Sequence, residues 1–187
     1  MKHNWKPGTM IYPLPAVMVS CGAAPEEYNI FTASWVGTLC TNPPMCYVSI
    51  RPERHSYELI KKNMEFVINL TTEELAKATD WCGVVSGRDH NKFEEMKLTP
   101  GKAAMVQAPI IEEAPLNIEC RVKEVIALGS HDMFIADVLN VQADDRYMDA
   151  ESGAFDMKQS NPLVYVHGKY YGLGDLIGKF GWSVKKK

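Results

Sequence analysis

Residues 29–57 read NIFTASWVGTLCTNPPMCYVSIRPERHSY, and this stretch decides the expected fold. Prolines 43 and 44 exclude a helix, so the chain must enter the next segment extended. Residues 45–50 then alternate in character, which predicts a strand with Cys46, Val48 and Ile50 on one face. The stretch therefore indicates strands that bury one face against a core.

Basic and hydroxyl side chains follow this strand. Arg51 and Arg54 precede Ser56, which we expect to be the N-cap of a short helix ending near Asn63. A helix N-terminus beside two guanidinium groups favours an anion such as a phosphate. The alternative is an ordinary strand–turn–helix in which the arginines are solvated and Arg54 pairs with Glu58.

The rest of the chain also has a β-rich pattern. Residues 16–21 are predicted to pair with residues 30–34, and residues 116–128 to form a long hairpin with residues 133–141, bulged near Lys123. Helices are expected to be brief, one of them starting from a capping box of Thr71 and Glu74 and ending near Trp81. Short strands with scattered Gly and Pro favour a closed or nearly closed antiparallel barrel.

Composition narrows the class of protein. The 187 residues fit one domain, and a net charge of −3 argues against a nucleic-acid partner. The first residues are polar and no apolar run is long enough to span a membrane, so a cytoplasmic protein is expected. The five cysteines contain no C-x-x-C pair and are expected to be reduced. A metal site of Cys40, Cys46 and His55 is disfavoured because its spacing fits no usual zinc pattern.

Several segments, taken in order, resemble one known family. They are residues 29–57, the strand-like FVINL at 66–70, Ser86-Gly87-Arg88 with Lys92-Phe93, residues 108–122, and YYGLG at 170–174. In this order they are similar to the flavin reductase-like proteins, the FMN-binding split-barrel group that includes flavoredoxin. The resemblance covers nearly the whole chain.

The resemblance implies a fold, an assembly and a cofactor. It implies a single domain over residues 1–187, mainly β, built as a Greek-key antiparallel split β-barrel with short flanking helices. It also implies a homodimer with FMN in a groove near the subunit interface. The positions that match the family's cofactor-binding residues are Asn29, Thr32, Ala33, Ser34, Trp35, Ser49, Ile50, Arg51, Ser56, Ser86, Gly87, Lys92 and His131.

Some of these roles have a plain structural alternative. Trp35 could be a core residue rather than a neighbour of the flavin ring, and His131 could be only a turn residue. One of Leu163, Val164 and Tyr165 is expected to approach the ring, without a choice among them. No catalytic residue is assigned.

The expected function is redox chemistry on bound FMN. The leading hypothesis is a flavin reductase-type oxidoreductase, in which electrons pass from NADH or NADPH through FMN to an acceptor. Since the chain has no dinucleotide-binding fingerprint, the nicotinamide would stack on an exposed flavin face. The alternatives are a flavoredoxin-like electron carrier with a redox protein partner, and a flavin-binding module without turnover.

Overall fold

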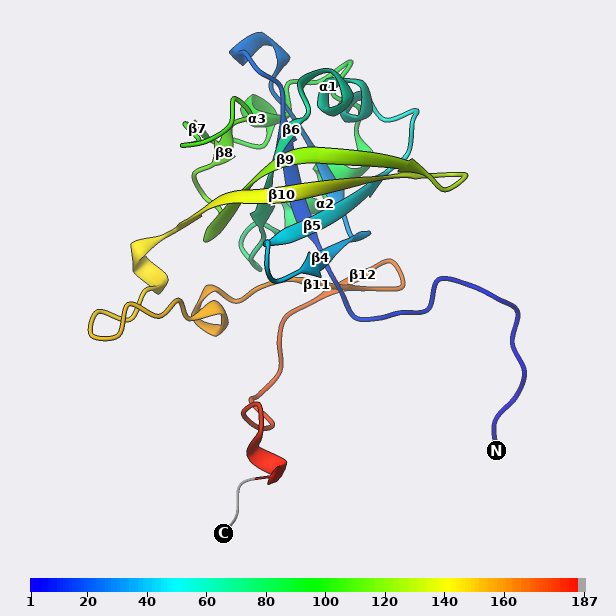
Figure 1. The fold of residues 1–187 in the computed structure, drawn as a ribbon, viewed down its shortest axis with the longest axis vertical. Coiled ribbons are helices and arrows are strands. Elements are labelled where there is room, and N and C mark those ends of the chain that lie inside the picture. Colours follow the sequence, from blue (N-terminus) through cyan, green and yellow to red (C-terminus); the bar gives the residue numbers. More distant parts are fainter. Residues whose placement is uncertain (185–187) are drawn as a thin grey trace.

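The computed structural model describes residues 1–184, and the chain folds around one curled antiparallel sheet of seven strands (Figure 1). Across the sheet the strand order is β3-β2-β6-β9-β10-β5-β4. The strands are β2 Val17–Cys21, β3 Asn29–Ala33, β4 Val36–Cys40, β5 Met45–Ile50, β6 Glu65–Leu70, β9 Leu116–Ala127 and β10 Asp132–Ala143. The chain is thus mainly β with a half-barrel sheet, as the resemblance implied.

Strands β3 and β4 lie at opposite edges of this sheet, although only Ser34 and Trp35 separate them in sequence. A two-residue connection can join both edges only if the sheet curls until they approach each other. Next to this connection, a backbone hydrogen bond of 2.8 Å from Ser49 N–H to the Trp35 carbonyl extends the pairing of β5 with β4. We call the place where the two edges meet the seam.

Smaller elements flank the main sheet. The short strands are β1 Leu14–Pro15, β11 Val164–Val166 and β12 Lys169–Tyr171, which form a three-stranded sheet, and β7 Pro100–Gly101 with β8 Ile110–Ile111. The helices are α1 His55–Asn63, α2 Ala76–Val84 and α3 Lys92–Glu95, with single turns η1 Pro25–Glu27, η2 Asp145–Tyr147, η3 Met157–Ser160 and η4 Trp182–Val184. No helix in residues 1–184 is long and apolar enough to cross a membrane. Residues 185–187, part of the expected domain, lie outside the described residues.

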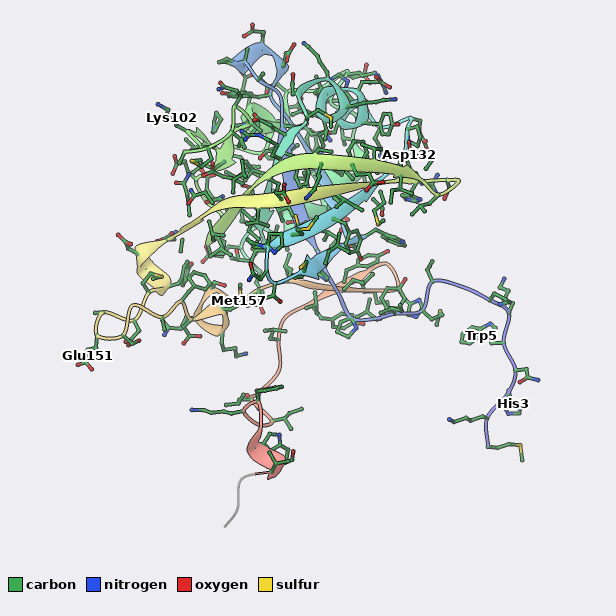
Figure 2. All side chains as sticks on the ribbon, in the orientation of Figure 1. His3, Trp5, Lys102, Asp132, Glu151 and Met157 are labelled. Carbon is green, nitrogen blue, oxygen red and sulfur yellow. The ribbon has the colours of Figure 1, made fainter. Side chains whose placement is uncertain are left out.

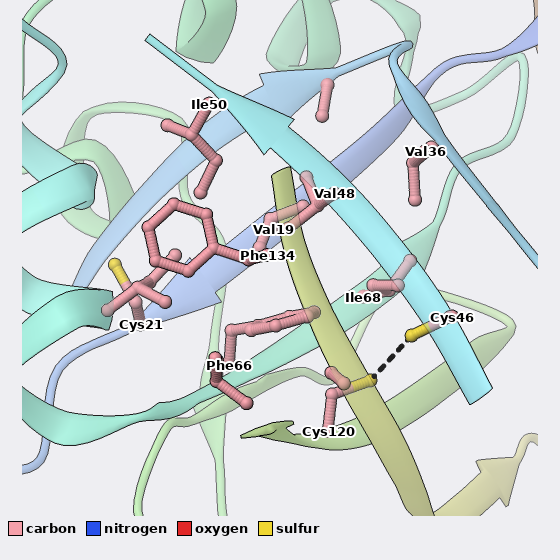
Figure 3. Close-up of a cluster of buried hydrophobic side chains, with 14 of the residues drawn as sticks. Val19, Cys21, Val36, Cys46, Val48, Ile50, Phe66, Ile68, Cys120 and Phe134 are labelled. Carbon is pink, nitrogen blue, oxygen red and sulfur yellow. Dashed lines mark hydrogen bonds between the residues drawn. The ribbon is translucent and has the colours of Figure 1, made fainter. Parts of the chain in front are cut away.

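The concave face of the sheet encloses the main core (Figure 3). Phe66 and Phe134 are fully buried there, and Val48 and Ile50 pack with them from β5. The alternation predicted for β5 is confirmed, since its buried residues are Cys46, Val48 and Ile50. Burying one such side chain stabilises the fold by about 1.5–3 kcal/mol.

Two thiols meet in this core. The sulfur atoms of Cys46 and Cys120 lie 3.5 Å apart, and both residues are free cysteines (Figure 3). Cys46 is on β5 and Cys120 is on β9, with β10 between them. Neighbouring strands are about 4.8 Å apart, so residues two strands apart exceed the usual Cα separation of a disulfide.

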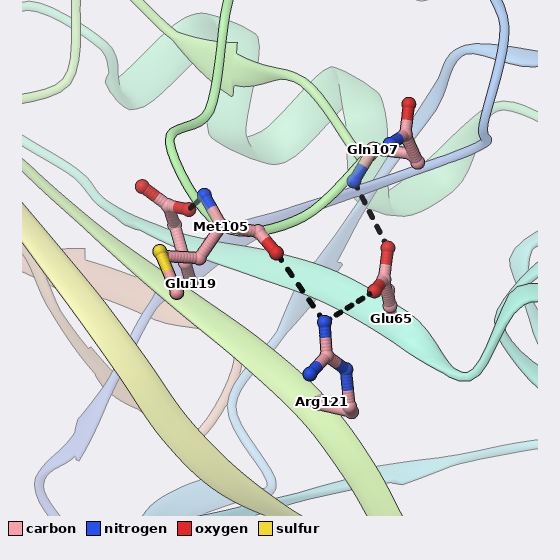
Figure 4. Close-up of polar contacts among 5 residues, drawn as sticks. All are labelled: Glu65, Met105, Gln107, Glu119 and Arg121. Carbon is pink, nitrogen blue, oxygen red and sulfur yellow. Dashed lines mark hydrogen bonds and ion pairs between the residues drawn. The ribbon is translucent and has the colours of Figure 1, made fainter.

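A buried carboxylate fixes the loop after β7. Glu119 on β9 is fully buried, and its oxygens accept hydrogen bonds from the backbone N–H groups of Ala104 at 3.1 Å and Met105 at 2.6 Å. Asn140 and Gln142 on β10 donate to the same carboxylate. Nearby, Glu65 accepts from Gln107 N–H and from Arg121 (Figure 4).

The long hairpin matches its prediction, whereas two predicted helix starts are wrong. A register shift places the bulge of β9 at Lys123, between the pairs Glu124–Ile135 and Val122–Ala136. Helix α1 begins at His55, so Ser56 is inside it and is not its N-cap. Thr71 and Glu74 form no capping box: α2 begins at Ala76, and the Thr71 hydroxyl donates instead to the Ala16 carbonyl.

Candidate functional site

A cavity of about 430 Å³ lies between the end of β5, the start of α1 and the loop after α2. Four basic side chains line it against one carboxylate, that of Glu53: Arg51, Arg54, Arg88 and Lys92. We call it the basic cavity. Arg51 pairs with Glu53 at 3.2 Å, and Arg88 donates to the Glu53 carbonyl. The remaining excess of positive charge favours an anionic ligand.

Lys92 carries the most constrained of these charges. The residue is 3% exposed, and its ammonium donates to the carbonyls of Ile30 and Cys82, each at 2.7 Å. No carboxylate pairs with it anywhere in residues 1–184. Burial lowers the pKa of Lys92 to about 8. Since an ammonium has three donors, one N–H remains for a ligand in the cavity.

Asn29, Ser56 and Gly87 form the opposite wall. The Asn29 amide donates to the Ser56 hydroxyl at 2.7 Å, and both residues are buried. A Cβ atom on residue 87 would lie only 2.0 Å from Asn29 Oδ1, so this position requires glycine. The packing thus brings the loop backbone directly against the amide of Asn29.

A second cavity, of about 460 Å³, adjoins the first and shares Phe31, Arg51 and Arg54 with it. It opens at the seam of the sheet. Its walls carry five ring side chains, those of Phe31, Trp35, His131, Tyr165 and Tyr170. We call it the aromatic cavity.

Trp35, in the β3–β4 connection, and His131, in the β9–β10 turn, both line this cavity. Their rings are nearly parallel, with an interplanar angle of 11° and centroids 6.1 Å apart. Trp35 is 37% exposed, so it is not a core residue. Burial and then Arg51 lower the pKa of His131 below its usual range. The imidazole is therefore mostly neutral near pH 7.

Helix α2 closes one side of the aromatic cavity. A Cβ atom at Gly83 would lie 3.1 Å from the Thr32 side chain, so glycine lets the helix approach β3 closely. The Thr32 hydroxyl donates to the Thr79 carbonyl and ties the strand to the helix.

The hairpin of β11 and β12 closes the other side. The Tyr170 hydroxyl donates to Asp80 of α2 at 3.1 Å, and burial raises the pKa of Tyr170 to about 12. Among Leu163, Val164 and Tyr165, the cavity is lined by Tyr165. Asp80, Gly83 and Tyr170 were not among the site residues predicted from the sequence. The signal that could have indicated Tyr170 is the adjacent pair Tyr170-Tyr171, which lies within the YYGLG motif.

The structure brings all the predicted site residues together in these two cavities. The basic cavity holds Asn29, Arg51, Ser56, Ser86, Gly87 and Lys92. The aromatic cavity holds Thr32, Ala33, Ser34, Trp35, Ser49, Ile50, Arg51 and His131. Arg54 also lines both cavities and forms no ion pair with Glu58 or any other residue in the described part of the chain. The assignment of these residues to a cofactor stays a prediction.

This pair of cavities suits an elongated ligand with two different ends. The basic end can hold an anion, and the aromatic end can hold a flat ring system between side chains. The described part of the chain contains no group of three or more His, Cys, Asp or Glu residues arranged to hold a metal ion.

Comparisons with known proteins identify related sequences and structures. The family model of the flavin reductase like domain matches residues 9–174. Flavoredoxin of Desulfovibrio vulgaris (Miyazaki F) is similar with a TM-score of 0.91 and 28% identity, over 99% of this chain and 100% of its own. Flavoredoxin from Methanosarcina acetivorans gives a TM-score of 0.87 and 27% identity, over 99% and 100%. An FMN-binding protein from Thermus thermophilus, solved with bound 1-cyclohex-2-enone, gives 0.75 and 26%, over 92% and 96%.

Proposed function

The chain belongs to the flavin reductase-like domain family and has a flavin-related redox function, and from this premise we propose that it binds FMN and oxidises NADH or NADPH. One observation carries the proposal: a basic cavity with four basic side chains and one carboxylate adjoins an aromatic cavity at the seam. FMN has the same two parts, a phosphate and a flat ring. When bound, FMN would supply the redox chemistry, taking electrons from the nicotinamide and releasing them to an acceptor.

The residues present fit the phosphate of FMN. Within residues 1–184, Lys92 has no carboxylate partner, and its ammonium uses two of its three donors, so a phosphate would complete the environment of a buried cation. Arg51, Arg54 and Arg88 add guanidinium groups at the same cavity, and Ser56 and Ser86 add hydroxyls. Charge-assisted hydrogen bonds of this kind are about twice as strong as neutral ones.

At the ring end, this chain's residues would orient the cofactor rather than move protons. Trp35 and His131 would border the ring, while Tyr165 and Tyr170 would limit the space left for a second ligand. Asp80 accepts a hydrogen bond from Tyr170 and so fixes the tyrosine ring. A reaction that depends on positioning needs reacting groups about 3–3.5 Å apart and no acid–base pair.

The test of this proposal is anaerobic mixing of FMN-loaded protein with NADH and with NADPH. We expect the flavin absorbance to bleach within about seconds with at least one nucleotide. We also expect little change in rate between about pH 6 and 8, because a reaction that depends on positioning needs no acid–base pair. Burial lowers the pKa of His131, which further favours its neutral form. The His131→Ala variant should behave like the parent protein in this pH range.

A second candidate is an electron carrier like the flavoredoxins. The observation that favours it is similarity to two flavoredoxins over 99% of this chain. Slow bleaching with both nucleotides, together with rapid bleaching by a reduced protein donor, would replace the reductase proposal by this one.

We also propose that the chain forms a homodimer in the cytoplasm with FMN near the subunit interface. It exposes 11878 Å², whereas a compact protein of 21.0 kDa exposes about 9,000 Å². The excess of roughly 2,900 Å² is comparable with what one subunit buries in a large obligate interface. This supports an assembly in which part of the surface is covered.

A further inference from the structure

The segment after β12 is exposed along nearly all of its described length. Residues 172–184 extend away from the sheets and stand clear of the body of the molecule (Figure 1). We call this segment the tail. Its contact with the body includes a hydrogen bond of 2.8 Å from Lys158 to the Leu173 carbonyl.

The tail is rich in exposed apolar side chains. Ile177 is 93% exposed and Phe180 is 108% exposed, and the others are Leu173, Leu176, Trp182 and Val184. An apolar patch larger than a few hundred Å² on a soluble protein marks an interaction site. A segment that presents six such residues to water therefore requires a covering surface.

An apolar surface of matching character lies beside the flavin site. Residues 8–11 of the N-terminal arm, with Leu14, Ser34, Trp35 and Tyr47, line a cavity of about 370 Å³. We call it the arm cavity. Ile11 at its rim is 85% exposed. Figure 2 shows Trp5 and His3 further along the same arm, away from the barrel.

The arm and the tail leave the same small sheet. The arm leads into β1 and the tail continues from β12, and both strands pair with β11 in one small sheet. The arm cavity and the tail thus both lie next to this small sheet, and the tail projects away from the molecule. In a two-fold symmetric dimer each subunit can offer its tail to the cavity of the other.

The sequence directly after the tail is basic. Asp175 and Lys179 cancel within residues 172–184, but Lys185, Lys186 and Lys187 follow them. Because clusters of basic residues also suit an anionic membrane surface, the test below includes phospholipid vesicles as a competing outcome.

We propose that the tail of each subunit packs into the arm cavity of a second copy of this chain. The inference rests on the homodimer proposed above and adds a contribution of the partner to the site. Trp35 lines both the arm cavity and the aromatic cavity, so the partner's tail would hold Trp35 from the side opposite the flavin. The ring end of the site is then complete only in the dimer.

The test uses the full chain and follows trypsin cleavage after Lys179, an exposed residue of the tail. Sedimentation velocity first gives the dissociation constant of the dimer. We expect cleavage at least ten-fold slower above this concentration than below it. The variant Leu176→Ser/Phe180→Ser should raise the dissociation constant at least ten-fold and remove the protection. The matched control is Leu128→Ser, at an exposed leucine in the β9–β10 turn, which should change neither value.

The outcomes that overturn the inference are separable. A dimer whose tail is cleaved equally fast above and below the dissociation constant would place the tail outside the interface and leave the dimer standing. Protection that persists in the monomer would show that the tail folds back on its own subunit. Protection only with anionic phospholipid vesicles would assign the tail to a membrane. A stable monomer would refute the homodimer as well, whereas a failure of nicotinamide oxidation would affect none of these measurements.

Discussion

Lys92 allows a direct test of the phosphate end of the site. Replacing it by methionine keeps a long side chain but removes the charge that faces the basic cavity. Since one charge-assisted bond is worth about 1.5–3 kcal/mol, FMN should bind roughly ten-fold or more weakly. Riboflavin lacks the phosphate, so its affinity should hardly change. Titrations of both flavins measure this, with exposed Lys77→Met as the control; equal weakening of both flavins would remove Lys92 from the phosphate site.

The same side chain predicts a pH dependence of binding. Because the pKa of Lys92 is lowered to about 8, its charge is fully present at pH 6–7 and is lost as the pH rises through that value. FMN affinity should therefore fall between about pH 8 and 10, by less in a strongly bound complex because the phosphate raises the pKa of the lysine again. Fluorescence titration at pH 7 and 9.5 checks this. In Lys92→Arg, which stays charged, a decrease of the same size would exclude Lys92 as its cause.

Gly87 tests the opposite wall of the basic cavity. An added methyl group would overlap the Asn29 side chain, whose amide is engaged with Ser56. We expect Gly87→Ala to displace Asn29 and weaken FMN binding by about ten-fold, with a smaller loss of stability, since overpacking costs about 1–3 kcal/mol. Gly174→Ala, at a position with open space around it, is the control. Unchanged FMN affinity in Gly87→Ala would show that this wall does not contact the cofactor.

At the scale of elements, Glu119 connects β9 to the loop that follows β7. Burial alone would raise its pKa, but hydrogen bonds from Asn140, Gln142 and two backbone N–H groups hold the pKa below its usual value. A carboxyl whose pKa is lowered by folding stabilises the protein above its unfolded pKa of about 4.3 and loses this contribution as the pH falls through the folded value.

We therefore expect Glu119→Gln to destabilise the protein at pH 7 by about 2–3 kcal/mol, because it weakens bonds to a buried charge. The difference from the parent should shrink below about pH 4. Urea unfolding at pH 7 and at pH 3.5 measures both values. The control is Glu124→Gln, at an exposed position on the same strand. A difference that is the same at both pH values would contradict the role of the charge.

The elements could be predicted where they depend on residues that are neighbours in the sequence, and not where a side chain bonds a residue far away in the sequence. The alternation of β5 and the bulge at Lys123 are properties of neighbouring residues, so the sequence predicted them correctly. Ser56 and Thr71 were assigned to helix starts because their local patterns suit caps. Their hydroxyls instead bond Asn29 and the Ala16 carbonyl, partners that only the tertiary fold brings near. The pairing of Tyr170 with Asp80 was missed for the same reason.

At the scale of the whole molecule, the sequence indicated which residues lie together, and their role in holding a cofactor stays a prediction. The family resemblance pointed to residues that the fold gathers in two adjoining cavities. It gave no reason to expect an exposed tail, because the apolar residues of the tail show no helix or strand periodicity in the sequence. Only the folded structure shows that these apolar side chains are exposed.

The seam has a consequence for how the protein unfolds. Because β3 and β4 are the two outer strands of a seven-stranded order, the aromatic cavity exists only when every intervening strand is paired. Opening either edge strand thus also opens the cavity, so retention of FMN becomes a measure of pairing across the whole sheet. In urea, loss of flavin and loss of sheet should coincide, and FMN at about 100 times its dissociation constant should add about 2.7 kcal/mol to the free energy of unfolding. Amide hydrogens of the edge strands should then exchange at the rate of complete unfolding, although edge strands usually exchange first.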